Sequence, residues 1–435
     1  MPTIALATLG CKLNFAETSA LGQQFVDRGY TPVDFGLPAD VTVINTCSVT
    51  ARADRECRQL IRRTLRASPE SVVVVTGCYA QLKPEEAASI DGVDFVMGTR
   101  EKASIASAIG IPRKQPSPRV CVSDIGAADD FGPAWSSEAG GRTRAFLKVQ
   151  DGCDYSCSFC TIPRARGTSR SQGIGETVRQ AEELVERGYR EIVLTGVNVG
   201  DYGRKSGTDL AALLRALAGV GGLERLRISS IEPNLLTDEI IGFVASNGVM
   251  CRHFHVPLQS GSDEMLRGMR RRYSAGGYAE RIRRVIDCIP DCGIGVDVIV
   301  GFPGESDRHF LDTCAFVADL PVSYLHVFTY SERPDTPASL SASPVDPGVR
   351  AVRSRILRGI GLRKKQEFYR RMVGKTVPVL LEADEQDGCR CGFTGNYVRV
   401  TVPAGDAPGN SLVEVVITGL RDDRCTGRVS GGTPA

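Results

Sequence analysis

The sequence is short of net charge and of long apolar runs, and each shortage excludes a class of protein. Its 435 residues include 53 basic and 51 acidic side chains, a formal net charge of +2. The surface as a whole therefore attracts no polyanion, and any nucleic-acid surface must be a local patch. No run of about 18 apolar residues could span a bilayer, and the start MPTIALATLG lacks the features of a signal peptide. We therefore expect a cytoplasmic protein.

Histidine is also scarce. The four histidines, His253, His255, His309 and His326, are scattered along the chain, which predicts no shared metal site. No Ser-His-Asp arrangement competes for nucleophilic chemistry. Asp297 and Glu305 are either structural or in contact with a substrate, and both interpretations stay open.

Length and hydrophobic patterning predict an α/β protein of several domains. A chain of 435 residues is too long for one hydrophobic core. Over residues 1–110, the apolar runs TIALATL, VTVINT, VVVVTG and VDFVMG alternate with amphipathic stretches at 14–29, 51–67 and 83–90. This alternation predicts a small α/β domain with a parallel sheet. Residues 111–142 are rich in Pro, Ser, Gly and Asp, which predicts a linker.

The central and C-terminal segments have different patterns. Residues 143–372 repeat a strand and a helix six times, with predicted strands at 145–150, 191–196, 225–230, 252–257, 293–301 and 324–330. Six such units with right-handed crossovers predict a partial (β/α)6 barrel or an open curved sheet. Residues 373–435 lose helical periodicity, and their short strands and Gly-rich turns predict a small all-β barrel.

Cysteine, in contrast, is abundant, with 15 residues. In a reducing compartment, close-spaced cysteines are metal ligands or catalytic thiols rather than disulfide partners. Cys153, Cys157 and Cys160 lie in DGCDYSCSFCTIP, directly after the first strand of the central domain. Three thiolates can hold a 4Fe-4S cluster with one open iron, whereas the alternative is a zinc site completed by a remote ligand. Phe159 inside the loop and the position after the strand favour the cluster.

A second trio of cysteines follows three predicted strands of the first domain. Cys11, Cys47 and Cys78 each come directly after an apolar run. Because parallel strands deliver their carboxyl ends to one edge of a sheet, the three thiols can converge. They predict a second cluster with one open iron; the alternative is three buried, unreactive cysteines. We predict that the other nine are not ligands: Cys57, Cys121, Cys251, Cys288, Cys292, Cys314, Cys389, Cys391 and Cys425.

The stretch CDYSCSFC is similar to the signature of radical S-adenosylmethionine (radical SAM) enzymes. The resemblance implies that the open iron chelates S-adenosylmethionine and that one electron breaks its sulfonium bond to give a 5′-deoxyadenosyl radical. It also implies cofactor contacts from residues after successive strands of the central domain. These residues are Phe159, Gly196 in TGVNVG, Ser230 and Glu232 in SSIEPN, Gln259 in HVPLQSGS, and Ile299 and Gly301 in VDVIVGFPGE.

Two open clusters and a terminal barrel together resemble the methylthiotransferase family over almost the full chain. The central segment ends in YSERPDTPA, and GFTGNYVRV looks like a TRAM-type RNA-binding barrel. The family converts C-H to C-SCH3 and uses two S-adenosylmethionine molecules per turnover. The resemblance further implies an electron donor such as flavodoxin or ferredoxin and a sulfur source.

Within the family, LGCKLNFAET and GCYAQ are most similar to the subgroup acting on N6-threonylcarbamoyladenosine beside the anticodon of tRNA. The isopentenyladenosine subgroup has Gln-Met where this chain has Lys12 and Leu13. The alternatives are therefore isopentenyladenosine in tRNA and an aspartate of ribosomal protein S12. A more distant alternative is a zinc-stabilised RNA-binding protein without catalysis.

Basic residues predict where tRNA binds. Residues 350–371 carry nine Lys or Arg against one acid, Glu367, and such a helix attracts phosphates. We predict contacts from Arg363, Lys364, Lys365, Arg370 and Arg371, although a solvated helix face is the alternative. MRRRY at 269–273 predicts a second patch. The terminal barrel has more acidic than basic residues, so Phe393 and Tyr397 are expected to contribute by stacking.

Overall fold

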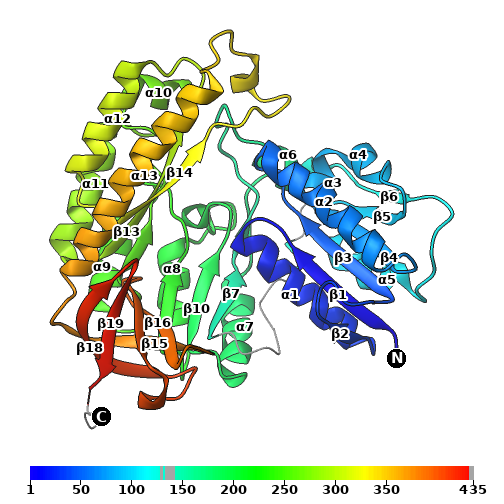
Figure 1. Cartoon of the computed structure of the whole chain (residues 1–435), viewed down its shortest axis with the longest axis horizontal. Coiled ribbons are helices and arrows are strands. Elements are labelled where there is room, and N and C mark those ends of the chain that lie inside the picture. Colours follow the sequence, from blue (N-terminus) through cyan, green and yellow to red (C-terminus); the bar gives the residue numbers. More distant parts are fainter. Residues whose placement is uncertain (128–130, 133–142, 431–435) are drawn as a thin grey trace.

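The computed structural model describes residues 1–127, 131–132 and 143–430, which form three units in chain order (Figure 1). An N-terminal α/β unit lies beside a central unit whose helices cover the outside of a curved sheet. A small β-barrel closes the C-terminal end. The predicted fold class is therefore confirmed. No helix in the described part of the chain is long and apolar enough to cross a membrane.

The N-terminal unit is a six-stranded parallel sheet in the order β2-β1-β3-β4-β5-β6. Its strands are β1 Thr3–Thr8, β2 Thr31–Val33, β3 Val41–Thr46, β4 Val72–Gly77, β5 Val93–Met97 and β6 Arg119–Cys121. Its helices are α1 Lys12–Val26, α2 Ala51–Ala67, α3 Cys78–Leu82, α4 Pro84–Ala88 and α5 Ile105–Ile109. Strands β3, β4 and β5 are buried along their whole length, which is why they read as continuous apolar runs.

Strand β6 lies inside the segment that was predicted to be a linker. Residues 119–121 pair with β5 in parallel register and complete the sheet. Three residues of strand among prolines and serines give too short a pattern to be recognised in the sequence. The N-terminal unit therefore extends beyond residue 110. Residues 128–130 and 133–142 of the predicted linker lie outside the described residues.

The central unit has the six predicted strands. They are β7 Arg144–Lys148, β10 Glu191–Thr195, β11 Arg225–Ile228, β12 His253–His255, β13 Gly293–Val300 and β14 Tyr324–Thr329. They form the parallel sheets β11-β10-β7 and β12-β13-β14. The Leu226 amide donates to the Val249 carbonyl (2.8 Å) and the Ile231 amide to the His255 carbonyl (2.9 Å), which joins the two sheets. The result is an open, curved parallel sheet.

Eight helices and one short hairpin complete the described part of the central unit. The helices are α6 Ile162–Arg166, α7 Ile174–Glu186, α8 Leu210–Ala218, α9 Asp238–Ser246, α10 Asp263–Gly268, α11 Ala275–Cys288, α12 Asp307–Asp319 and α13 Pro347–Arg370. Strands β8 Gln150–Asp151 and β9 Arg170–Ser171 form the hairpin. Side chains alternate across each strand: Ile294, Val296 and Val298 of β13 join the main core. Asp297 therefore points to the opposite, inner face of the sheet.

The C-terminal unit is a closed barrel in the order β15-β16-β17-β19-β18. Its strands are β15 Thr376–Gln386, β16 Cys389–Thr394, β17 Arg399–Pro403, β18 Leu412–Arg421 and β19 Arg424–Val429. Two arginines of β11 fix the barrel to the central sheet. Arg225 donates to the carbonyls of Pro378 (2.6 Å) and Phe393 (2.7 Å), and Arg227 donates to the carbonyl of Gly395 (3.0 Å).

Buried charges join the N-terminal and central units. Glu17 of α1 accepts hydrogen bonds from Arg166 (2.9 Å) and from Lys102, and pairs with Lys148 (3.3 Å). Arg166 also pairs with Asp151 at 2.9 Å. Burial alone would raise the pKa of Glu17, but Arg166, Lys102 and Lys148 hold it well below the usual range. One carboxylate thus satisfies three cations from two units.

Replacing Glu17 by glutamine is expected to destabilise this junction. The amide keeps the shape of the side chain but leaves the buried cations short of one negative charge. Breaking a buried pair in this way costs about 3–5 kcal/mol, measurable as a lower urea midpoint. The control is Glu176→Gln, which removes an exposed partner of Arg179 and should cost less than about 1 kcal/mol. Equal effects of the two substitutions would contradict the proposed role of the buried cluster.

The same carboxylate predicts a pH dependence. The folded-state pKa of Glu17 lies below the ordinary value of 4.5, so its stabilising contribution is complete above that value and is lost as the pH falls below it. Between pH 6 and pH 3 (about one to two units either side of the ordinary pKa), the Glu17→Gln variant should therefore lose less unfolding free energy than the parent chain.

Candidate functional site

The first cysteine trio lies in one tight loop between β8 and α6. The Cys153 amide donates to the Gly167 carbonyl (3.0 Å), and the Cys160 amide to the Cys157 carbonyl (3.1 Å). Gly152 has a φ of +68°, and a Cβ there would lie 1.9 Å from the Thr168 carbonyl oxygen. Only glycine fits this position. The loop is therefore tight, and its three thiols lie close enough to act on one another's pKa.

The electrostatics of this loop suit a soft metal centre. Burial, with neighbouring thiols adding to it, raises the pKa of Cys153 to about 11 and of Cys160 to about 12. Three thiolates so close together need a compensating positive charge, which bound iron provides. Backbone amides of Tyr155 and Ile162 donate to the sulfurs of Cys153 (3.4 Å) and Cys160 (3.5 Å). A three-thiolate set with amide donors fits an iron-sulfur cluster with one open coordination position.

Arg271 is the outer partner of this trio. Its Nη1 donates to the Cys157 sulfur (3.2 Å) and its Nη2 to Glu232, and its side chain is only 4% exposed. Arg271 belongs to MRRRY, which was predicted to be a basic surface patch. That prediction is wrong for Arg271. Arg272 is also in contact with the protein, since its guanidinium carbon lies 3.9 Å from the centroid of the Tyr155 ring. The sequence does not reveal that Arg271 is buried, because the burial arises where the segment between α10 and α11 folds back onto the cysteine loop.

Replacing Arg271 by methionine is expected to weaken the cluster. The Cys157 sulfur would lose a charged donor, and loss of such an outer partner typically lowers metal affinity or activity by about 10–100-fold. The visible absorbance that survives gel filtration under anaerobic conditions measures retention of the cluster. Arg267→Met, at an exposed position on α10, is the matched control. If both variants retained the cluster equally, the contact would have no role in holding it.

The residues predicted to bind the cofactor lie in the order expected, at the carboxyl ends of successive strands. Phe159 packs with Ile299 in one small apolar cluster, and its ring meets Phe302 edge-on at 6.5 Å. A Cβ on Gly196 would lie 2.9 Å from Gln150 Oε1, so the backbone approaches β8 closely. Gly301 has a φ of +75° and lies against Arg350.

Three further residues that were predicted to contact the cofactor also lie just after strands of the central sheet. Ser230 and Glu232 follow β11 and are half-buried. Gln259 has a φ of 70° and its amide donates to the Asp297 carbonyl at 2.8 Å. This strained backbone position fixes the loop after β12 against β13. Cofactor contact from all these residues stays a prediction.

Asn198 is a candidate that the sequence reasoning missed. It lies two residues after Gly196, and its backbone amide donates to Gln150 Oε1 (2.8 Å). The side chain is 4% exposed, and neither of its polar atoms has a partner among the described residues. A buried amide without partners carries a free-energy penalty that a bound ligand can remove. The motif TGVNVG contains this asparagine, but its pattern alone points to the glycine.

The second cysteine trio lies at one edge of the N-terminal sheet. Cys11, Cys47 and Cys78 follow β1, β3 and β4, which are neighbours in the sheet. Gly10 has a φ of +108°, and a Cβ there would lie 2.7 Å from the Cys47 Cβ. A Cβ on Gly77 would lie 2.5 Å from the Thr46 carbonyl oxygen. The two glycines therefore allow the cysteine loops to approach one another.

Charge also connects these three thiols. Burial, together with the nearby Cys78 and Cys11, raises the pKa of Cys47 to about 12. Burial also raises the pKa of Cys78, against the influence of Arg166 and Lys102. The donor set again fits a cluster held by three thiolates with an open position. Cys57 lies close by, but its thiol donates to the Cys47 carbonyl (3.3 Å).

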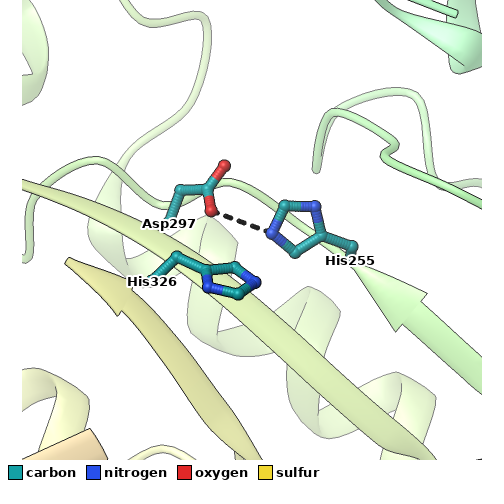
Figure 2. Close-up of side chains that lie close together, drawn as sticks. All are labelled: His255, Asp297 and His326. Carbon is teal, nitrogen blue, oxygen red and sulfur yellow. Dashed lines mark hydrogen bonds and ion pairs between the residues drawn. The ribbon is translucent and has the colours of Figure 1, made fainter. Parts of the chain in front are cut away.

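The histidines correct one prediction. The scattered positions of the histidines predict no shared metal site, yet Figure 2 shows His255 and His326 beside Asp297. His255 Nε2 lies 2.9 Å from Asp297 Oδ1, and the candidate ligand atoms of all three residues lie within 4.8 Å of one another. Adjacent parallel strands β12, β13 and β14 bring together residues that are 29 to 71 positions apart.

Only some of the basic side chains in the predicted RNA-binding helix are exposed to solvent. Arg363, Arg370 and Arg371 are exposed on or beside α13. Lys364 donates to the carbonyls of Ala318 (2.5 Å) and Leu320 (2.6 Å), and so it holds the end of α12. Lys365 lies 3.6 Å from Asp423 of the barrel. Within the same helix, Arg350 and Arg353 are buried in ion pairs.

Phe393 and Tyr397 were expected to stack on RNA bases, and the structure does not match this expectation. Both are half-buried, and their rings stack on each other at 5.0 Å. The Arg144 guanidinium covers the Phe393 ring at 4.6 Å and Arg227 covers Tyr397 at 5.1 Å. The rings join the barrel to the central sheet, because arginines of β7 and β11 occupy their faces.

Two family profiles match the chain. One, described as the radical SAM superfamily, matches residues 147–317, and one described as the uncharacterized protein family UPF0004 matches residues 3–98. Threonylcarbamoyladenosine tRNA methylthiotransferase MtaB of Bacillus subtilis is 39% identical, over 96% of this chain and 94% of its own. The tRNA-2-methylthio-N(6)-dimethylallyladenosine synthase of Corynebacterium jeikeium is 32% identical, over 96% of this chain and 84% of its own.

A solved structure shares the fold. The radical S-adenosylmethionine methyltransferase TsrM from Kitasatospora setae, with cobalamin and a 4Fe-4S cluster bound, superposes with a TM-score of 0.58. It is 17% identical, and the match covers 78% of this chain and 77% of that one. At this identity the likeness concerns architecture alone.

Proposed function

This chain belongs to the radical SAM methylthiotransferase family, and from this premise we propose that it inserts a methylthio group at C2 of N6-threonylcarbamoyladenosine beside the anticodon of tRNA. The observation that carries the proposal is its near full-length similarity to enzymes of that name. Two cysteine trios at the ends of parallel strands support it, because the reaction needs both a radical and a source of sulfur.

The first trio is assigned to the radical step. S-adenosylmethionine and a 4Fe-4S cluster are cofactors of this family, and Cys153, Cys157 and Cys160 would hold the cluster. Bound there, they supply a one-electron cleavage that yields a hydrogen-abstracting radical. The protein's own part is to position and shield: Phe159 and Ile299 offer an apolar surface, and Gly196 and Gly301 let the backbone approach. Ser230, Glu232, Gln259 and Asn198 offer polar contacts.

The second trio is assigned to sulfur. We infer that Cys11, Cys47 and Cys78 would hold a second 4Fe-4S cluster, at which the sulfur of the methylthio group would accept its methyl. Two S-adenosylmethionine molecules would then be consumed per turnover, one for the methyl group and one for the radical. An external sulfur source and an electron donor such as flavodoxin or ferredoxin complete the reaction, which we place in the cytoplasm.

The tRNA surface is assigned to the exposed arginines of the helix that precedes the barrel. Arg363, Arg370 and Arg371 are exposed and can contact phosphates of the anticodon stem-loop. Lys364 and Lys365 already contact the protein, so their share is smaller than the sequence suggested. Phosphate contacts position the RNA without reading its sequence.

Nucleoside mass spectrometry tests the substrate. In tRNA from a strain that lacks this gene, the methylthio group should disappear from N6-threonylcarbamoyladenosine and return with the gene. Its persistence would reject the proposal, and loss from N6-isopentenyladenosine or from an aspartate of ribosomal protein S12 would identify an alternative substrate. A brown anaerobically reconstituted protein supports iron-sulfur clusters, whereas a colourless zinc protein would support the non-catalytic alternative.

A further inference from the structure

The inner face of the central sheet carries a polar cluster beside the predicted cofactor contacts. Asp297 of β13 pairs in register with His326 of β14, and its carboxylate lies 2.9 Å from Nε2 of His255 on β12 (Figure 2). In the tautomer in which His255 Nε2 donates to this carboxylate, Nδ1 is an acceptor. The cluster thus offers a carboxylate oxygen and an imidazole nitrogen as acceptors.

The cluster lies close to the place where the radical would form. Ile299 is two residues after Asp297 on β13 and points to the same face, about 7 Å along the strand. Ile299 packs with Phe159 of the cysteine loop. The substrate atom that loses hydrogen has to reach this end of the sheet, so its substituents extend along the inner face.

Lys12 reaches the same face from the other domain. Three residues after it, Phe15 meets Phe146 of β7 edge-on at 5.7 Å. Phe146 alternates with the core residues Ala145 and Leu147, so the first turn of α1 lies over the inner face. Residues three apart share one side of a helix. Lys12 therefore overhangs the sheet directly beside Cys11.

The ammonium of Lys12 differs from the other cations of this face. Arg227 pairs with Glu191 at 2.7 Å and Arg144 with Glu382 at 3.0 Å. Among the described residues, no ion pair or hydrogen bond involves the Lys12 side chain. Its charge nevertheless acts on the cluster: burial and His255 lower the pKa of His326, Asp297 raises it, and Lys12 has a smaller lowering effect. A cation in this position lacks an anionic partner.

We propose that Lys12, His255, Asp297 and His326 bind the threonylcarbamoyl substituent of the substrate adenosine, with Lys12 pairing with its carboxylate. This inference rests on the proposed function and names the residues that read the substrate. The urea N–H groups and the threonine hydroxyl are donors, and they match the acceptors of Asp297 and His255. The positive charge of Lys12 would repel a metal cation bound to His255, Asp297 and His326. An apolar isopentenyl group would leave these polar side chains without hydrogen-bond partners.

Binding of synthetic anticodon stem-loops to the full chain tests the proposal. The RNAs carry threonylcarbamoyladenosine or its methyl ester, which removes the negative charge and keeps the remaining groups. A hydrogen-bonded charge pair predicts about 10- to 100-fold tighter binding of the acid than of the ester. The parent chain should show this preference, and Lys12→Met should abolish it while its affinity for the ester changes little.

Two further variants separate local from general effects. Arg28→Met removes an exposed charge just beyond the other end of α1 and should keep the full acid preference. Asp297→Asn together with His255→Phe should weaken binding of both RNAs, because it removes acceptors rather than the cation.

The outcomes distinguish this inference from the proposed function. If the parent chain binds acid and ester equally, or if Lys12→Met keeps the acid preference, the inference is overturned. The proposed function then still stands, provided that the parent chain forms the 2-methylthio nucleoside from the acid RNA. If the parent chain forms no such nucleoside, the proposed function fails whatever the binding data show.

Discussion

Replacing Cys47 by alanine should stop methylthio transfer while leaving cleavage of S-adenosylmethionine intact. Cys47 lies between Cys11 and Cys78 at the edge of the N-terminal sheet, with a Cβ on Gly10 only 2.7 Å from its own. Two thiolates cannot complete the three-thiolate cradle, so the second cluster should be lost. The loop of Cys153, Cys157 and Cys160 belongs to another unit and should keep its cluster.

The measurements for Cys47→Ala are iron content, 5′-deoxyadenosine and the methylthio nucleoside. Iron should fall from about eight to about four atoms per chain. The methylthio nucleoside should fall by more than the ~100-fold typical of an outer-shell loss, whereas 5′-deoxyadenosine should still form. Cys57→Ala is the matched control, because Cys57 is buried nearby and its thiol only donates to the Cys47 carbonyl. If Cys47→Ala kept eight irons and full methylthio transfer, Cys47 would not be a ligand of a second cluster.

The sequence was sufficient for features in which spacing alone determines geometry. The loop of Cys153, Cys157 and Cys160 is local, so its convergence follows from eight residues. Cys11, Cys47 and Cys78 are distant in sequence, but each ends a strand of one parallel sheet, and that topology brings them to one edge. The six strands of the central unit were also readable, because apolar side chains recur at alternate positions, as Ile294, Val296 and Val298 do in β13.

Features that depend on the direction of a side chain could not be predicted. His255 and His326 share a site because β12 and β14 flank β13 in a register that the sequence does not reveal. The basic run over 350–371 gave the correct helix but the wrong surface, since Arg350 and Arg353 turn inward to Glu332 and Glu305. Arg271 likewise turns from a presumed surface toward Cys157. Charge counts do not separate buried arginines from exposed ones.

Cys157→Ala should have the broadest effect of the cluster substitutions, because the radical step precedes the transfer of sulfur. Cys157 is buried and receives the Arg271 guanidinium at 3.2 Å. Its removal takes one of three thiolates and also leaves Arg271 with Glu232 as its remaining charged partner. Both 5′-deoxyadenosine and the methylthio nucleoside should therefore fall to the assay background, since the cofactor carries the bond cleavage.

The two alanine variants together separate the roles of the trios. Cys157→Ala should retain about four irons, now held by Cys11, Cys47 and Cys78, and its tRNA affinity should stay unchanged because the exposed Arg363, Arg370 and Arg371 are unaltered. Cys251→Ala is a suitable control, as Cys251 is buried near the barrel and outside both trios. If Cys157→Ala still formed 5′-deoxyadenosine, the assignment of the radical to this loop would be wrong. If Cys47→Ala and Cys157→Ala lost the same products, the two trios would not have separate roles.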